Sequence, residues 1–286
     1  MRSFTTRPKT NTEKEVRRMV ITGKKSPYTV IALLAHTASH RIYICKDAAG
    51  NLRLLQIAAT REANGGLGRG AYVLMQLTTE SQRLDGLYSA KHDGKHLHYD
   101  RLFPELVESF VCAEQDNRRV NILAFTDVAD VAGLVPLSSL RTRDQVRIDL
   151  KTSAWILGRL LKLLTFVHAQ GVAVRTIRSD NILLDTGKHF AIVLDWSSAR
   201  VYQQAIEREG SVADIASAAS AVMASIGGTS HGVPYELSEA EARYVTLLRR
   251  FGDGATTDAI SAHSQFYELV RNIWPNEFHP FTTLPL

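Results

Sequence analysis

The stretch from His168 to Asp195 constrains the fold of this chain more than any other. A long apolar-periodic helix is predicted from about Thr152 to Ala169, and the polar loop RTIRSDN follows shortly after it. Two short apolar strands, NILLD and FAIVLD, come next and flank a Thr-Gly turn. This order predicts cationic and amide side chains on a loop held between two buried segments.

The composition is that of an ordinary globular chain. Its 286 residues suit one large or two small lobes, and the formal net charge is +5. This mild basicity permits anionic partners but is too weak to indicate nucleic acid. No run approaches the roughly 18 apolar residues of a membrane span, and the N-terminus lacks the apolar core of a signal peptide. We therefore expect a cytoplasmic protein without a membrane span.

The two cysteines, Cys45 and Cys112, lie far apart in the sequence, each in a strand-like context. In a chain with this expected location, two buried free thiols are favoured over a disulfide or a reactive pair.

The first 25 residues are basic and polar, with eight lysines and arginines. We expect a partly flexible, solvated arm, in which Thr12 and Glu15 have the spacing of a capping box for a short helix. The alternative is that the arm binds an anionic partner.

Residues 26–128 have the pattern of a mostly antiparallel sheet with one helix. The helix is predicted over AYVLMQL, although the Gly-rich stretch GGLGRG before it is a poor helix start. The strands are predicted over YTVIALL, HRIYICK, LRLLQIAA, FPELVESFVCAE and RRVNILAF.

Residues 129–286 turn helical. Besides the long helix and the short hairpin, further helices are predicted over SVADIASAASAVMASIG, EAEARYVTLLRR and ISAHSQFYELVRNIW. The chain is therefore expected to be α+β, with a small β-rich lobe followed by a larger helical lobe.

Asp195 closes an apolar strand, and Asn181 lies about one hairpin earlier. A carboxylate and an amide oxygen on adjacent strand ends are hard ligands of the kind that Mg²⁺ and its phosphates require. A hairpin capped by ordinary hydrogen bonds explains the same residues equally well.

The order of helix, HAQG, polar loop, ILLD, turn and IVLDW resembles the catalytic core of the protein-kinase-like superfamily. There the pattern is H-R-D-x-x-x-x-N, an ILL strand, and an Asp-Phe-Gly sequence after the next strand. The likeness extends over about residues 28–272, from the first three strands to the last helices of a Ser/Thr kinase homologue. It implies a bilobal protein-kinase-like fold.

At the phosphate-binding positions the resemblance implies a degenerate site. The family's loop G-x-G-x-x-G is replaced by a stretch without glycine, so side chains stand where the family needs close backbone approach. Gln56 replaces the lysine of the third strand, and the helical glutamate that pairs with it falls at or near Gly70. The loop residues are Ala35, His36, Thr37, Ala38, Ser39 and His40, of which the two histidines are either exposed or in contact with an anion.

The catalytic loop is degenerate in the same way. Val174 stands at the family's histidine, Arg175 is kept, and Thr176 replaces the aspartate that acts as general base. Asn181 is kept, and Asp-Phe-Gly becomes Asp195-Trp196-Ser197, which retains only the metal-binding carboxylate. Asn181 and Asp195 are therefore the pair that would hold Mg²⁺.

Two further residues have a structural counterpart in the family. Asp214 resembles the buried aspartate that hydrogen-bonds the backbone of the catalytic loop, and Arg175 is expected to have a similar scaffolding task. The segment after Asp195 is short, and its Asp-Trp sequence is similar to that of aminoglycoside phosphotransferases, which modify small molecules. Those enzymes also keep the base aspartate.

The resemblance thus favours a pseudokinase, a non-catalytic regulatory or scaffolding module with protein partners. Binding of ATP and Mg²⁺ is expected to be weak or absent, and no cofactor is expected to be required. One alternative is a divergent active phosphotransferase, in which Lys46 or Arg53 on a nearby strand replaces the lost lysine. Another is a module that binds an anionic partner through the basic arm. The oligomeric state stays open.

His92, His96 and His98 lie close together in KHDGKHLHYD. No cysteine is nearby, so a solvated connection is favoured over a metal site.

Overall fold

The computed structural model describes residues 19–128, 130–274 and 278–286. They form two compact units. The first takes the described residues up to Ala71 with Leu106–Ala124 and 130–132, and the second takes Tyr72–Glu105, Phe125–Val128 and the rest of the chain. The expected boundary between residues 128 and 129 stays a prediction, and most of the basic arm lies outside the described residues.

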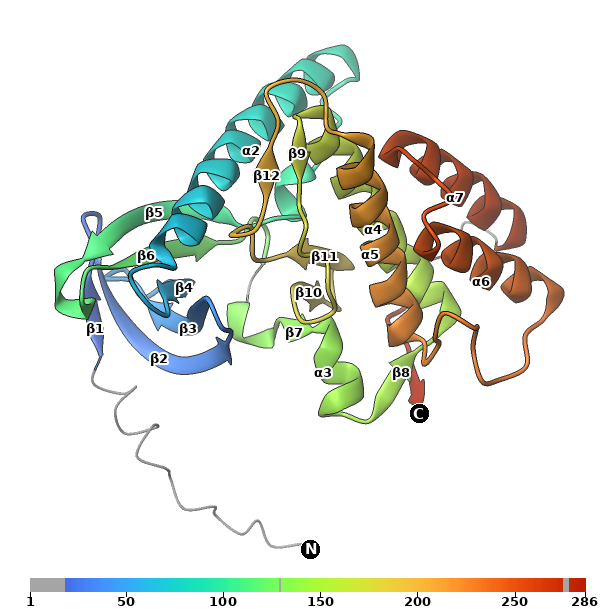
Figure 1. Cartoon of the computed structure of the whole chain (residues 1–286), viewed down its shortest axis with the longest axis horizontal. Coiled ribbons are helices and arrows are strands. Elements are labelled where there is room, and N and C mark those ends of the chain that lie inside the picture. The colour runs from blue at the N-terminus through green and yellow to red at the C-terminus, as the bar shows by residue number, and fades with distance from the viewer. Residues whose placement is uncertain (1–18, 129, 275–277) are drawn as a thin grey trace, which may run out of the picture. The chain divides into compact units, whose positions relative to one another are not determined.

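The first unit contains a six-stranded sheet in the order β1-β2-β3-β4-β6-β5 (Figure 1). Neighbouring strands from β1 to β6 in this order pair antiparallel, which confirms the predicted sheet. Alternate side chains such as Tyr28 and Val30 are buried, since successive residues of a strand point to opposite faces. The strands are β1 Val20–Thr22, β2 Pro27–His36, β3 His40–Lys46, β4 Leu52–Ala58, β5 Glu105–Cys112 and β6 Arg118–Ala124.

Both cysteines are free and buried in the core of this sheet, as predicted. Burial raises the pKa of the Cys45 thiol to about 12, and the neighbouring Asp47 carboxylate adds to the shift.

We expect neither thiol to react with Ellman's reagent at mildly alkaline pH while the protein is folded, because the reagent requires an accessible thiolate. Both should react at once when guanidinium is added. Fast reaction of one thiol in the native protein would contradict the buried position of that cysteine.

Helix α2, Asn64–Lys91, is much longer than the predicted segment and begins earlier. The expectation that the glycine-rich stretch makes a poor helix start was wrong, and tertiary contacts explain why. Asn64 Oδ1 accepts the backbone N–H of Arg119 at 2.6 Å, and Asn64 Nδ2 donates to the carbonyl of Asn117 at 2.9 Å. Gly68 lies against the Arg119 side chain, since a Cβ there would be 3.3 Å from Nε. The glycines thus let the helix lie close to the strand, at the cost of helix propensity.

The second unit contains the part of α2 from Tyr72 and the helices α3 to α7, of which α4 to α7 were predicted and the short α3 was not. Asp149 caps α4 by accepting the N–H of Thr152 at 2.7 Å, and Ser238 and Glu241 form a reciprocal capping box at the start of α6. Helix α4 packs against α5 and α7, and α6 packs against the same two helices (Figure 1). The helices are α3 Leu137–Thr142, α4 Leu150–Ala169, α5 Arg208–Ser225, α6 Glu239–Gly252 and α7 Ala259–Ile273.

The predicted hairpin is present as β10, Ile182–Asp185, and β11, Phe190–Val193. The two strands are antiparallel, and β10 also pairs with β7, Val135–Pro136. Helix α4 packs against β11, so the polar loop between β9 and β10 runs over a buried base. The remaining short elements are β8 Val146–Ile148, β9 Val172–Ala173, β12 Arg200–Val201, β13 Thr283–Pro285, η1 Tyr99–Arg101, η2 Ala113–Gln115 and η3 Val131–Gly133.

Among the described residues, no helix has both the length and the apolar character of a membrane span.

Candidate functional site

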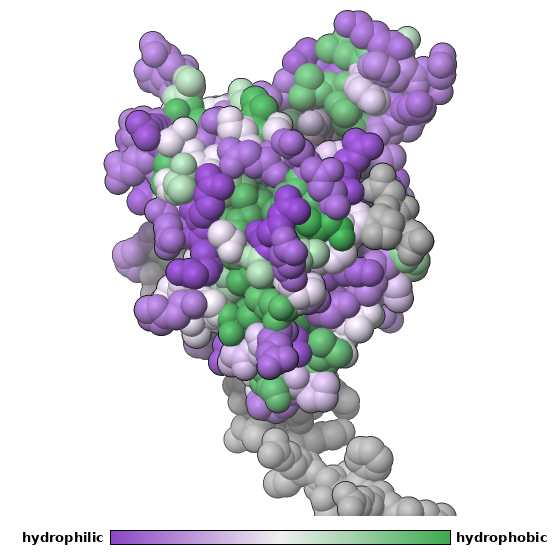
Figure 2. Space-filling model, turned by 90° about the vertical axis from the view of Figure 1, so that its right-hand side faces the viewer, coloured by the Kyte–Doolittle hydropathy of each residue, from purple (hydrophilic) through white to green (hydrophobic). Residues whose placement is uncertain are grey.

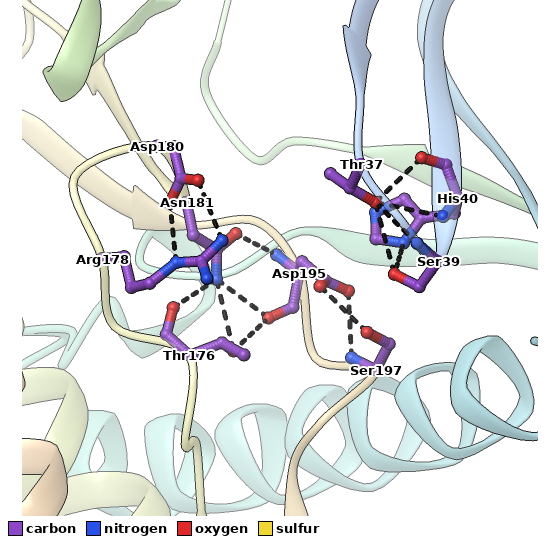
Figure 3. A network of polar contacts seen from close by, with 9 residues as sticks. All are labelled: Thr37, Ser39, His40, Thr176, Arg178, Asp180, Asn181, Asp195 and Ser197. Atoms are coloured by element: carbon purple, nitrogen blue, oxygen red, sulfur yellow. Dashed lines mark hydrogen bonds and ion pairs between the residues drawn. The ribbon is translucent and has the colours of Figure 1, made fainter.

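Asn181 is the centre of a polar cluster in the second unit (Figure 3). Its Nδ2 donates to the carbonyl oxygens of Thr176 at 2.8 Å and Asp195 at 3.0 Å. Its Oδ1 accepts the backbone N–H of Asp195 at 2.6 Å. One buried amide therefore ties the polar loop to the segment that follows β11.

The Thr176 hydroxyl donates to the backbone in this cluster, and its Oγ1 also accepts from Asn181 Nδ2 at 3.4 Å. Its Oγ1 donates to the carbonyl of Asp195 at 3.0 Å and lies 3.3 Å from the carbonyl of Val174. The hydroxyl proton is thus directed at backbone oxygens. An unactivated hydroxyl of this kind does not take up a proton at neutral pH.

Ser197 covers the carboxylate of Asp195 from two residues further along the chain. Its backbone N–H donates to Oδ1 at 3.0 Å, and its hydroxyl donates to Oδ2 at 2.9 Å (Figure 3). Ser197 is buried, so both hydrogen bonds lie in the interior of the protein. No role was predicted for Ser197 from the sequence, although a Ser two residues after an Asp is a known local pairing of side chain and backbone.

The structure therefore brings the two predicted Mg²⁺ ligands together. The oxygens of both residues accept hydrogen bonds from protein donors: the Asp195 N–H donates to Asn181, and Ser197 donates to Asp195. In the described part of the chain, no three His, Cys, Asp or Glu side chains gather in a way that could hold a metal. Mg²⁺ binding by Asn181 and Asp195 stays a prediction.

Asp214 holds the start of the polar loop. It is 1% exposed, and its carboxylate accepts the backbone N–H groups of Val174 and Arg175, each at 2.7 Å. His168 at the end of α4 places Nε2 3.0 Å from the same carboxylate, and its Nδ1 lies 3.2 Å from the Ser211 hydroxyl. These contacts agree with the structural part expected for Asp214. Sequence reasoning missed His168, whose signal is a histidine directly after the apolar pair Phe166 and Val167 at the end of α4.

Arg175 itself has an exposed side chain and a φ of +64°. A non-glycine residue in this left-handed region is strained, so its backbone is held there by the bond to Asp214. The scaffolding task expected for the Arg175 side chain stays a prediction.

The predicted phosphate loop of the first unit closes on itself (Figure 3). The Thr37 hydroxyl accepts the N–H groups of Ser39 at 3.3 Å and His40 at 3.0 Å, and Thr37 N–H donates to the His40 carbonyl at 2.9 Å. His40 is buried with Nδ1 2.9 Å from the Ser39 hydroxyl, whereas His36 is exposed and Ala35 is half-buried. Three backbone amides of the loop thus have partners inside the loop.

Gln56, predicted to replace the third-strand lysine, is a neutral amide that lies beside a second one, Asn121. Gln56 is 3% exposed on β4 and pairs in register with Asn121 on β6, which donates its Nδ2 to the Leu67 carbonyl of α2 at 3.0 Å. Gln56 Nε2 and Asn121 Oδ1 have no hydrogen-bond partner among the described residues. Gly70, at the expected glutamate position, is buried and has no side chain to offer. At this register the amide of Asn121 joins the helix to the sheet.

The two cations considered as replacements for the lost lysine are Lys46 and Arg53. Lys46 is exposed at the end of β3, and Arg53 Nε lies 3.3 Å from the carboxylate of Asp47. Neither pairs with Glu62 or Glu80, since Glu62 is exposed and Glu80 binds Arg83.

The three clustered histidines lie in a connection of turn and coil. His96 Nδ1 is 2.5 Å from the Asp85 carboxylate, and His92 stacks on Tyr88.

No protein-family model matches the sequence, and no curated protein sequence matches it. The fold is similar to solved kinase domains. The M. tuberculosis PknI kinase domain is 14% identical with a TM-score of 0.52, and the match covers 85% of this chain and 96% of that one. Vaccinia related kinase 3 is 13% identical with a TM-score of 0.63, covering 89% and 90% of the two chains.

The BubR1 kinase domain is 11% identical with a TM-score of 0.58, and the match covers 89% of this chain and 83% of that one. At these identities the likeness concerns the fold alone, and it confirms the predicted α+β architecture. The chain has the bilobal protein-kinase-like fold.

Proposed function

We propose that this protein is a pseudokinase, a non-catalytic regulatory or scaffolding module that acts through protein contacts in the cytoplasm. One observation carries the proposal. Thr176 stands where the family has its general base, and its hydroxyl donates to the Asp195 carbonyl at 3.0 Å. The group at this position is thus a donor bound to the backbone, whereas catalysis needs an acceptor aimed at a substrate hydroxyl.

The metal-binding pair supports the same proposal. Mg²⁺ is held through carboxylates and phosphates with several waters retained. Here Asn181 Oδ1 accepts the Asp195 N–H at 2.6 Å, and both Asp195 oxygens accept from Ser197. This donor set does not fit a resident Mg²⁺ well, because any ion has to displace or share hydrogen bonds that the chain already makes.

The phosphate-binding half gives a third argument. Cradling of phosphates relies on free backbone N–H groups and a cation. The Thr37 hydroxyl accepts two of the loop amides, and the buried Gln56 carries no charge. Weak or absent nucleotide binding follows from the loss of both.

Loss of these groups is expected to have a large effect on the rate of catalysis. A general base typically contributes about 10²–10⁴-fold, and the lysine and phosphate loop contribute positioning and charge stabilisation besides. Such losses do not add simply, but none of the groups described above replaces them. The rival proposal, a divergent active phosphotransferase, is favoured by one observation: Asn181 and Asp195 lie in direct contact.

We expect no rise in melting temperature when millimolar ATP is added, with or without Mg²⁺ or Mn²⁺. A ligand at a hundred times its dissociation constant stabilises a protein by about 2.7 kcal/mol, which is readily seen by differential scanning fluorimetry. A known active kinase serves as the positive control.

A radiolabelled-ATP assay on the full chain, with Asp195→Ala as its control, separates the two proposals. We expect the same background signal from both proteins. Turnover that disappears in Asp195→Ala, or a metal-dependent thermal shift, would refute the pseudokinase proposal.

A further inference from the structure

A cavity of about 760 Å³ lies within the second unit, between helices α4 and α7 and the residues Phe278 and His279. We call it the α4–α7 cavity. It is separate from the Asn181 cluster, since neither Asn181 nor its partners line it. Its size falls in the range of about 300–1,000 Å³ typical of sites for small molecules.

The charged side chains that line the α4–α7 cavity are all basic. Lys151, Arg159 and Lys162 of α4 line it, and no aspartate or glutamate is among its lining residues. Arg159 Nε donates to the carbonyl of His189, and Lys162 Nζ donates to the carbonyl of Leu97 at 2.5 Å. No carboxylate of the described residues forms an ion pair with Arg159 or Lys162. Partly buried cations in this arrangement attract an anion.

The ionisation of these groups agrees with a missing counter-charge. Burial, and then the nearby guanidinium groups of Arg159 and Arg101, lower the pKa of Lys162, which the more remote Asp100 and Asp85 offset in part. Burial, and then Lys162, lower the pKa of His263 in the same cavity. Each cation thus disfavours the charged form of its neighbours, and an anion bound among them would reverse this effect.

Aromatic rings form the other wall. Trp155 stacks on His189 with ring centres 4.8 Å apart, and His189 stacks on Phe278 with ring centres 4.9 Å apart. The indole N–H of Trp155 has no acceptor among the described residues. A buried donor without a partner is rare in native proteins, so this N–H is available to an acceptor in the cavity.

Helix α7 supplies the apolar floor. Phe266 is buried against α4 at Gly158, where a Cβ would lie 3.0 Å from the ring, and Val270 and Trp274 line the next turns. Apolar side chains also reach the surface between hydrophilic ones on the side of the unit that bears α6 and α7 (Figure 2). The cavity therefore combines apolar walls with cations on one side.

We propose that the α4–α7 cavity binds a small organic anion, a carboxylate or phosphate carried on an aromatic ring. The anion would lie beside Arg159 and Lys162, and the ring would lie against the aromatic wall. The basic N-terminal arm of the chain is a poor occupant, because its charge has the same sign as the cavity. The proposal does not depend on the pseudokinase proposal, since it concerns other residues.

The test is isothermal titration of the full chain with four probes: 1-naphthyl phosphate, 2-naphthoate, neutral 2-naphthylmethanol and inorganic phosphate. We expect at least one naphthyl anion to bind, and the neutral alcohol to bind about tenfold more weakly or not at all, because charge-assisted hydrogen bonds are lost. Which anion binds more tightly distinguishes a phosphate from a carboxylate ligand. Equal binding of the alcohol and the anions, or no binding of either anion, would overturn the proposal.

The double variant Arg159→Gln/Lys162→Gln should weaken anion binding about tenfold or more. The matched control is Arg41→Gln/Lys46→Gln, which removes two exposed charges from the first unit and should leave binding unchanged. If the cavity variant melts early, Lys151→Glu replaces it, since Lys151 is exposed at the rim and its loss should not unfold α4. Unchanged affinity in a folded cavity variant would also overturn the proposal.

Discussion

Asp214→Ala is expected to lower the free energy of unfolding by about 3–5 kcal/mol, the largest effect we predict for a single side chain. The carboxylate is 1% exposed and accepts two backbone N–H groups, those of Val174 and Arg175, besides its contact with His168. Removing it leaves several buried polar groups without an acceptor. Each such group costs about 1–3 kcal/mol.

Urea denaturation followed by circular dichroism measures this effect. Asp214→Asn should have an intermediate effect, because an amide keeps one acceptor oxygen and turns the other atom into a donor that faces backbone N–H groups. The control is Asp180→Asn, which changes an exposed aspartate paired with Arg178 and should cost less than about 1 kcal/mol. If Asp214→Ala unfolds at the wild-type midpoint, Asp214 does not hold the loop.

Asn181→Asp is expected to lower the free energy of unfolding by about 2–4 kcal/mol although the side chain keeps its size. Asn181 donates to the carbonyl oxygens of Thr176 and Asp195. A carboxylate cannot donate, so the variant would place a negative charge against two carbonyl oxygens and beside Asp195. The Asn181→Asp substitution also distinguishes a structural role of this side chain from a role as a metal ligand.

A metal ligand would behave in the opposite way, because an additional carboxylate strengthens binding of a hard cation. We therefore expect the stability of Asn181→Asp to be the same with and without millimolar Mg²⁺. The control is Asn272→Asp on the exposed face of α7, which should cost less than about 1 kcal/mol. A stable Asn181→Asp variant whose free energy of unfolding rises strongly with Mg²⁺ would contradict the structural role that we describe for Asn181.

Local patterns were sufficient for much of the fold. The strands β2, β3 and β4 follow from β-prone runs and a turn at Gly50, and the long helix α4 follows from its apolar period. The start of α2 could not be predicted, because Asn64 gains its partners from Arg119 and Asn117, more than fifty residues away. Where helix propensity is low, such contacts decide the boundary.

The candidate site divides in the same way. Thr176, Asn181 and Asp195 were found from their order along the chain, and the structure brings them into one cluster. The role of His168 was not visible, since its partner Asp214 is 46 residues away. Ser197 is local, but its bonds to Asp195 depend on the direction in which the backbone leaves β11. Sequence order thus identified the candidate residues but not which of their atoms are already engaged.

The hairpin between β2 and β3 has a consequence for recognition. Because Thr37 holds the amides of Ser39 and His40 within the loop, the loop reaches its final shape without any ligand. Under the pseudokinase proposal, a partner that docks on this hairpin would meet the same surface at any concentration of ATP. The hairpin is then suited to a constitutive contact, whereas a glycine loop that changes with nucleotide is suited to a switch.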